Sequence, residues 1–239
     1  MSSATTDQTE ARPHQLKYLY VVLLLLFLII ARPILPAGFI HQIAVLAIAF
    51  VAWITLGKGT KARIILAVLV VPALFGIVGR SFVPFEAGDK LSEAFEGALL
   101  FLACALLFYS ACNILISLLL TKHVVADDIL GAISLYLIIG YMFAFLYSAI
   151  ELFSPDSFVT ATALPEPMEG QGRGLITSRF VYFSFITLAS QGYGDMTPRN
   201  ELAESAVILE TIVGQLYIAL VIAYLLSVHV AQRLLEKNQ

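Results

Sequence analysis

Long apolar runs dominate the chain. They occupy residues 18–35, 38–56, 62–79, 97–120, 129–153 and 203–228. A membrane-spanning helix needs about 20 mostly apolar residues, within a range of roughly 17–25. Each run meets this requirement, so the pattern predicts six transmembrane helices after a polar, flexible N-terminal tail at 1–16. The first run resembles a signal peptide in following Arg12 and Lys17, but no small-residue cleavage site comes after it, which favours an anchor.

The composition supports a bilayer environment. Hydrophobic residues make up 59% of the chain and charged residues 13%, against roughly 45–50% and about 25% in soluble domains. The net charge of −3 gives no support to a nucleic-acid partner. Loops 57–63 and 121–128, together with both termini, carry a small excess of Lys and Arg. This bias predicts a multi-pass protein of the cell membrane with both termini in the cytoplasm.

The segment between the last two runs has a different pattern. A loop rich in Pro and Gly at 154–174 precedes an apolar stretch at 175–189 that is too short to span a bilayer. The sequence SQGYGD follows it. Non-helical backbone at membrane depth is tolerated only when it is buried in protein or lines a watery path. We therefore expect a re-entrant helix and a loop that together form the functional part of the chain.

The glycines of this loop suggest how it binds an ion. Gly192 and Gly194 allow positive φ at every second position, and alternating backbone handedness can turn successive carbonyls toward one side. Four such strands around an axis would form rings of oxygens that replace a cation's hydration shell. The negative end of the short helix dipole would also favour a cation. The alternative is a tight Gly-Tyr-Gly turn in an ordinary loop.

The segment FITLASQGYGDMTP resembles the signature of the potassium-channel family, Thr-Val-Gly-Tyr-Gly-Asp. The resemblance covers about residues 129–230. It implies an all-α membrane protein whose re-entrant pore helix and filter loop lie between helices five and six. It also implies a homotetramer with K⁺ as the permeant ion and no other cofactor. The filter would comprise Ser190, Gln191, Gly192, Tyr193 and Gly194, with K⁺ bound at the first four.

The same resemblance assigns supporting roles. Asp195, Thr187 and Tyr182 would support the filter, and Gly214 stands where the family often has the hinge of its inner helix. Helical spacing from Gly214 then predicts a pore-lining stripe, for which ordinary helix packing is the alternative. Its members are Gln215, Ile218, Ile222 and Leu226.

Three positions depart from the family pattern. Ser190 replaces Thr and keeps the hydroxyl, whereas Gln191 replaces Val and brings an amide to a crowded site behind the filter. Tyr182 and Phe183 replace a Trp pair, and Phe183 has no polar tip to hold Tyr193. The alternatives to a potassium-selective channel are therefore a weakly selective cation channel and a non-conducting subunit of a channel assembly.

The first four runs form a membrane domain at 17–126, ahead of a pore domain at 127–239. Voltage sensing requires several charges that move in the field. Residues 97–120 contain no Lys or Arg, so we expect gating that is independent of voltage. An enzyme would need clustered ionisable groups, yet Glu151 and Glu210 are the only acidic residues near helix interiors. A transporter is less consistent with a single GYG loop, and no small-molecule substrate is indicated.

Overall fold

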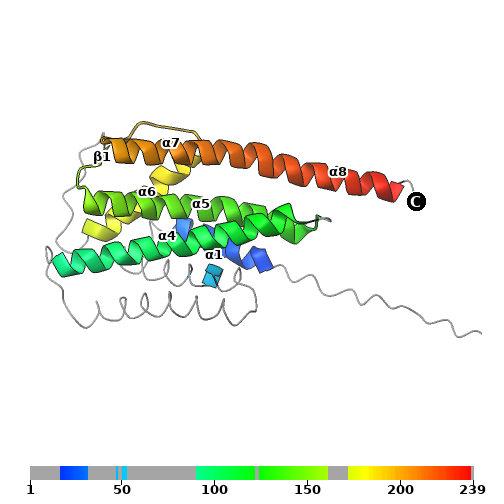
Figure 1. The fold of residues 1–239 in the computed structure, drawn as a ribbon, viewed down its shortest axis with the longest axis horizontal. Coiled ribbons are helices and arrows are strands. Elements are labelled where there is room, and N and C mark those ends of the chain that lie inside the picture. The colour runs from blue at the N-terminus through cyan, green and yellow to red at the C-terminus, as the bar shows by residue number, and fades with distance from the viewer. Residues whose placement is uncertain are drawn as a thin grey trace, which may run out of the picture.

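The computed structural model describes residues 17–31, 47, 50–52, 90–121, 124–160 and 172–237. The expected tail at 1–16 and most or all of the second and third apolar runs lie outside these residues. Figure 1 shows the fold, coloured along the chain from the N-terminus to the C-terminus, and the helices and strands follow here in chain order. They are α1 (Lys17–Ala31), α4 (Lys90–Leu119), α5 (Ala126–Phe153), β1 (Phe158–Thr160), α6 (Gly172–Leu188), β2 (Met196–Pro198), α7 (Glu201–Leu216), the π-helical segment η1 (Tyr217–Ile222) and α8 (Ala223–Lys237).

Three helices of the described part are long and apolar enough to cross a membrane. They span Gly97–Leu119, Ala126–Phe153 and Glu201–Val228, which are the fourth, fifth and sixth apolar runs of the sequence. Helix α1 and the part of α6 at Arg179–Leu188 are apolar but shorter. The protein is therefore mostly helical and consistent with an all-α membrane protein, while the total of six spans stays a prediction.

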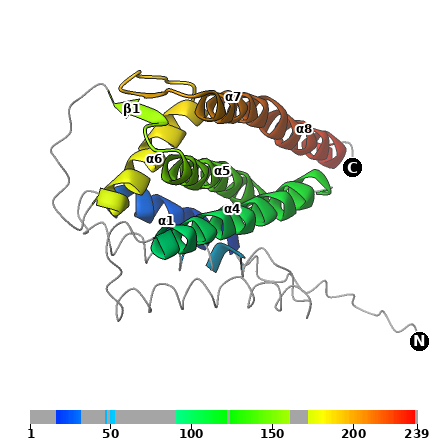
Figure 2. The ribbon, with the colours of Figure 1, turned by 60° about the vertical axis from the view of Figure 1, so that its left-hand side comes forward.

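Helix α5 lies at the centre of the described structure. Helices α4, α1, α6 and α7 all pack against it, as Figures 1 and 2 show from two directions. Its buried residues include Leu135, Ile138, Phe143 and Tyr147, which helical spacing places on more than one side of the helix. A helix that is apolar on all sides must be covered by protein or by lipid. The sequence of α5 is therefore that of a core or membrane helix, and the packing of four other helices against it gives it the central position.

Polar residues mark the starts of the two long helices of the pore region. Asp127 and Asp128 lie in the first turn of α5, and Asp128 Oδ2 accepts a hydrogen bond of 2.9 Å from the Val125 N–H. The Asn200 side chain caps α7 by accepting a 2.8 Å bond from the Ala203 N–H. Such side chains bind backbone groups that lack a helical partner, and carboxylates also favour the positive end of the helix dipole.

A small antiparallel sheet joins the two ends of the pore segment. Strands β1 and β2 pair in the register Phe158↔Pro198, Val159↔Thr197 and Thr160↔Met196. The sequence did not predict these strands, because three residues are too few to show an alternating pattern. The sheet holds the chain that leaves α5 against the chain that enters α7.

A π-helical segment interrupts the last long helix. Residues Tyr217–Ile222 adopt it between α7 and α8, and the helix continues on both sides. The Tyr217 side chain anchors this segment to α5, where its hydroxyl donates to the Ala132 carbonyl and its ring lies 5.5 Å from that of Tyr136. Segments of this kind are often found at functional sites.

Candidate functional site at the end of helix α6

Helix α6 ends in a hydrogen-bonded turn that leads directly into the Ser190–Gly194 segment. The Gln191 N–H donates to the Ile186 carbonyl at 2.8 Å, and the Ser190 N–H donates to the Thr187 carbonyl at 2.8 Å. With Ser190 in the left-handed conformation, these two bonds form a Schellman motif. The turn satisfies carbonyls of the last helical turn and fixes the direction in which the chain leaves α6.

Positive φ recurs at every second residue of this segment. The values are +56° at Ser190, +53° at Gly192 and +75° at Gly194. Glycine adopts this conformation without a Cβ clash, whereas a residue such as serine does so at a cost of roughly 1–2 kcal/mol. The two glycines had predicted positive φ at alternate positions, and the structure extends the alternation to Ser190. The backbone carbonyls of this segment are therefore the candidate cation ligands.

The segment lies on the surface of the single chain. Its five residues are all exposed, and 66% of the Tyr193 side chain is accessible. An exposed aromatic ring beside an exposed backbone with alternating positive φ is unusual on the surface of a folded chain. The candidate ligand backbone is therefore open to a partner surface or to solvent in the single chain.

Helix α7 touches the end of α6 at two adjacent residues. The Gln215 side-chain amide donates a 2.6 Å hydrogen bond to the Ser190 hydroxyl. Next to it, Gly214 is buried, and a Cβ at this position would lie 2.3 Å from the Leu188 carbonyl oxygen. Gly214 is thus required for the close approach of α7 to α6. Its expected role as a hinge stays a prediction.

Tyr182 and Asp195 form a second contact beside the segment. The Tyr182 hydroxyl makes a side-chain hydrogen bond to the Asp195 carboxylate. Among the residues that the structure describes, Oδ1 of Asp195 is buried and has no partner. The resemblance gave each of the two residues a supporting role at the filter, and the structure brings their side chains together.

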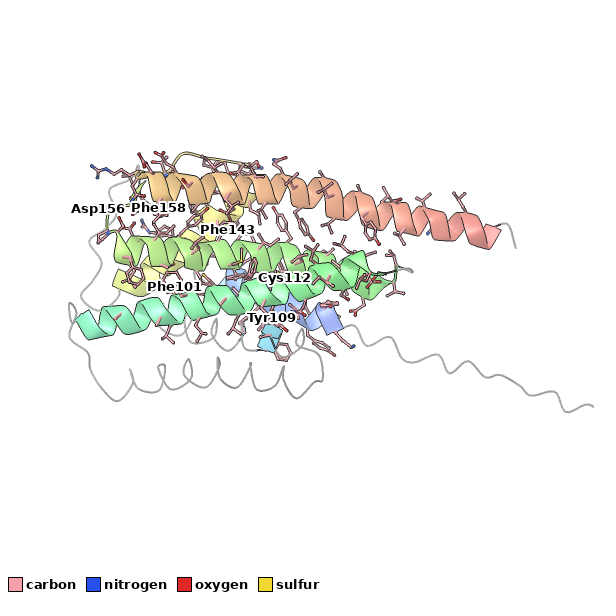
Figure 3. The ribbon with its side chains drawn as sticks, in the orientation of Figure 1. Phe101, Tyr109, Cys112, Phe143, Asp156 and Phe158 are labelled. Carbon is pink, nitrogen blue, oxygen red and sulfur yellow. The ribbon has the colours of Figure 1, made fainter. Side chains whose placement is uncertain are left out.

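Phe183 belongs to an aromatic cluster on the other side of α6. Its ring centroid lies 5.3 Å from that of Tyr147 and 5.6 Å from that of Phe158. The Phe158 ring also lies 4.8 Å from that of Phe180, and Figure 3 shows Phe158 at the same end of the molecule as Asp156. The cluster packs α6 against α5 and β1. Phe183 is therefore directed into the core of the chain, where Tyr193 does not lie.

The two glutamates singled out in the sequence both brace this region. Glu151 accepts hydrogen bonds from the backbone N–H groups of Asp156 at 2.9 Å and Phe158 at 3.2 Å, which fixes the loop ahead of β1. Glu210 is fully buried, and hydroxyls from α5 and α6 lie 2.5 Å from its two carboxyl oxygens. Sequence reasoning missed these hydroxyl partners, because nothing in the sequence distinguishes them from other Ser and Tyr residues.

The expected pore-lining stripe meets the π-helical segment. Gln215, Ile218 and Leu226 are exposed, and the Ile222 side chain lies outside the described part of the structure. The stripe was counted with α-helical spacing, but η1 takes more residues per turn than an α-helix. Helical spacing therefore no longer places Ile222 and Leu226 on the same face of the helix as Gln215. The pore-lining role of these residues stays a prediction.

A comparison with known protein families bears on this site. Residues 131–231 match the model of a family described as ion channel. The match runs from α5 to α8 and so includes α6, the Ser190–Gly194 segment and α7. No curated protein and no solved structure matches the chain. The match, together with the apolar helices, supports an ion channel in a membrane.

Proposed function

We propose that this chain is one subunit of a potassium-selective channel that conducts ions passively through a pore formed by four copies. The observation that carries the proposal is the alternating positive φ at Ser190, Gly192 and Gly194, directly after a helix end. Backbone of this kind offers a row of carbonyl oxygens to a dehydrated cation, which is how K⁺-selective filters coordinate their ion. The carbonyls of Ser190 through Tyr193 are the proposed K⁺ ligands.

Four identical copies are the simplest assembly that completes such a site. One chain supplies one strand of carbonyls, and one strand cannot surround an ion. The exposure of Tyr193 and its neighbours in the single chain also supports a partner surface. Native mass measurement of the detergent-solubilised protein should give a tetramer, and a stable monomer or dimer would contradict the proposal.

The surroundings of the proposed filter suit a cation. The C-terminal end of α6 points its partial negative charge toward the Ser190 end of the segment. The chemistry requires K⁺ and the lipid bilayer, and it involves no cofactor, nucleic acid or small-molecule substrate. We place the protein in the cell membrane as a multi-pass chain with both termini in the cytoplasm and a re-entrant α6.

A weakly selective cation channel is the second candidate, with a non-conducting subunit as its limiting case. The observation that favours it is the direction of Phe183, which packs on Tyr147 and Phe158 and offers no hydrogen bond to the Tyr193 hydroxyl. A filter that is held by fewer hydrogen bonds discriminates less well between ions of different size. Gln191 adds a polar side chain next to the same segment.

Flux through reconstituted liposomes tests both candidates. We expect K⁺ flux well above Na⁺ flux in the wild type, whereas equal fluxes would favour the second candidate and no flux the non-conducting subunit. Gly192→Ala is the informative variant, because a Cβ there meets nothing within 4 Å while φ is +53°. Its expected loss of flux would therefore report the backbone conformation or the contact between copies, and not a clash within one chain. Tyr109→Phe on α4, outside the pore region, serves as a control for expression and reconstitution.

A further inference from the structure

Three helices meet at a chain of close oxygen contacts inside the described structure. Tyr147 Oη of α5 lies 2.5 Å from Glu210 Oε2 of α7, and Glu210 Oε1 lies 2.5 Å from Ser184 Oγ of α6. Ser184 Oγ also lies 2.6 Å from the Gly140 carbonyl oxygen of α5. Glu210, Tyr147 and Ser184 are completely buried.

The number of protons available to these oxygen contacts depends on whether Glu210 is protonated. Each contact brings two oxygens within hydrogen-bond distance, so each needs one proton. Tyr147 and Ser184 carry one proton each, which leaves one of the contacts without a proton if Glu210 is ionised. A neutral carboxyl supplies the missing one. Tyr147 then donates to Glu210, Glu210 donates to Ser184, and Ser184 donates to the Gly140 carbonyl.

The surroundings favour the same state. Both side-chain partners of Glu210 are uncharged hydroxyls, and no described Lys or Arg forms an ion pair with it. Among the described residues, the titratable groups near it are the phenols of Tyr147 and Tyr136, both on α5, while Ser184 is its partner on α6. Burial of an unpaired charge is very unfavourable, so a group in this position neutralises instead.

We infer that Glu210 is held as a neutral acid whose hydrogen bonds join the inner helix to α5 and to α6, and so position the proposed filter. The protonation state is independent of the proposed function, whereas the effect of Glu210 on conduction rests on it. Ser184 lies six residues before Ser190 on the helix that ends at the filter. A displacement of α6 at Ser184 would therefore move the Schellman turn. Glu210 is a positioning residue, since it touches α6 and not the ion.

Infrared spectroscopy of the full-length reconstituted protein tests the protonation state directly. The difference spectrum of wild type minus Glu210→Gln at neutral pH should contain the C=O stretching band of a protonated carboxyl, shifted in D₂O. Glu204→Gln is the matched control, because Glu204 is an exposed acid on the same helix and its difference spectrum should lack this band. Absence of the band for Glu210 would overturn the inference. This readout does not require conduction, so it is independent of the proposed function.

Flux and stability measurements test the positioning role. A glutamine keeps the pattern of the neutral acid, accepting from Tyr147 and donating to Ser184, so Glu210→Gln should stay within about twofold of wild-type K⁺ flux. Glu210→Ala leaves two buried hydroxyls without this partner and should lower flux or the folded population at least about fivefold. Equal losses in the Gln and Ala variants would overturn the role, and so would an unaffected Ala variant.

Discussion

Gln215 and Ser190 are joined by a 2.6 Å hydrogen bond from the glutamine amide to the serine hydroxyl. The bond connects the inner helix to the residue at which the chain turns from α6 into the proposed filter. Ser190 holds a φ of +56° there, in a conformation that serine adopts with strain. The bond compensates part of that strain and links the position of α7 to the conformation of the filter's inner end.

Loss of this bond should weaken conduction. Gln215→Leu keeps the side-chain volume but removes the donor, and a hydrogen bond of this kind contributes about 0.5–1.5 kcal/mol. We expect K⁺ flux to fall about twofold to tenfold, with reduced K⁺/Na⁺ discrimination. A double-mutant cycle with Ser190→Ala is the control, because the two changes should not be additive if they remove the same bond. Additive losses would show that Gln215 acts elsewhere.

A methyl group at Gly214 should disturb the contact between α7 and α6. The added Cβ would meet the Leu188 carbonyl oxygen at 2.3 Å, and a backbone atom cannot move aside as a side chain can. Overpacking of this kind costs about 1–3 kcal/mol. The thermal midpoint of the purified protein should therefore fall in Gly214→Ala. Gly131→Ala is the matched control on α5, since its Cβ meets side chains and no backbone atom, with the Tyr18 ring at 3.1 Å and Leu118 Cδ2 at 3.6 Å. Equal effects of the two substitutions would contradict the proposed contact.

Removal of the Tyr182 hydroxyl should destabilise the outer end of the proposed filter. Tyr182 is the hydrogen-bond partner of Asp195, whose Oδ1 already lacks a partner among the described residues. Tyr182→Phe keeps the ring and removes only the hydroxyl, so the open time of single channels should shorten. Tyr109→Phe removes an equivalent hydroxyl from α4 and should change nothing. An unchanged open time in Tyr182→Phe would argue against a supporting role.

Gln191→Val tests the most unusual residue of the segment. In the single chain the Gln191 side chain is exposed and its backbone N–H is bonded to Ile186. In a tetramer the side chain would lie behind the filter, where an unsatisfied amide costs about 1–3 kcal/mol. We expect valine to raise K⁺ selectivity or open probability without altering assembly. Reversal potentials in mixed K⁺ and Na⁺ measure this, and worse selectivity would indicate a fully hydrogen-bonded glutamine.

Voltage should have little effect on gating. Helix α4 contains no Lys or Arg between residues 97 and 119, and each charge that crosses the field contributes about 2.3 kcal/mol per 100 mV. A conductance–voltage relation recorded in planar bilayers should be shallow. A steep curve equivalent to several gating charges per subunit would place a sensor elsewhere in the chain.

The sequence alone determined the features that depend on local composition. Helices over the fourth, fifth and sixth apolar runs follow from their length and hydrophobicity, and a short helix before SQGYGD follows from an apolar stretch that ends at a glycine-rich turn. Gly192 and Gly194 predicted alternating positive φ, because only glycine adopts this conformation freely. These properties depend on each residue and its near neighbours.

Tertiary packing decided what depends on residues far apart in the chain. The Ser184–Glu210 contact joins residues 26 positions apart and the Tyr147–Glu210 contact residues 63 apart. The pairing of β1 with β2 likewise brings together two segments too short to show a pattern of their own. The sequence did not predict the π-helical segment that begins at Tyr217 either, because its residues also occur in ordinary α-helices. The contact that anchors the Tyr217 side chain to α5 is visible only in the tertiary structure. In each case the partner is selected by the geometry of packed helices, and residue type along the chain carries no signal for it.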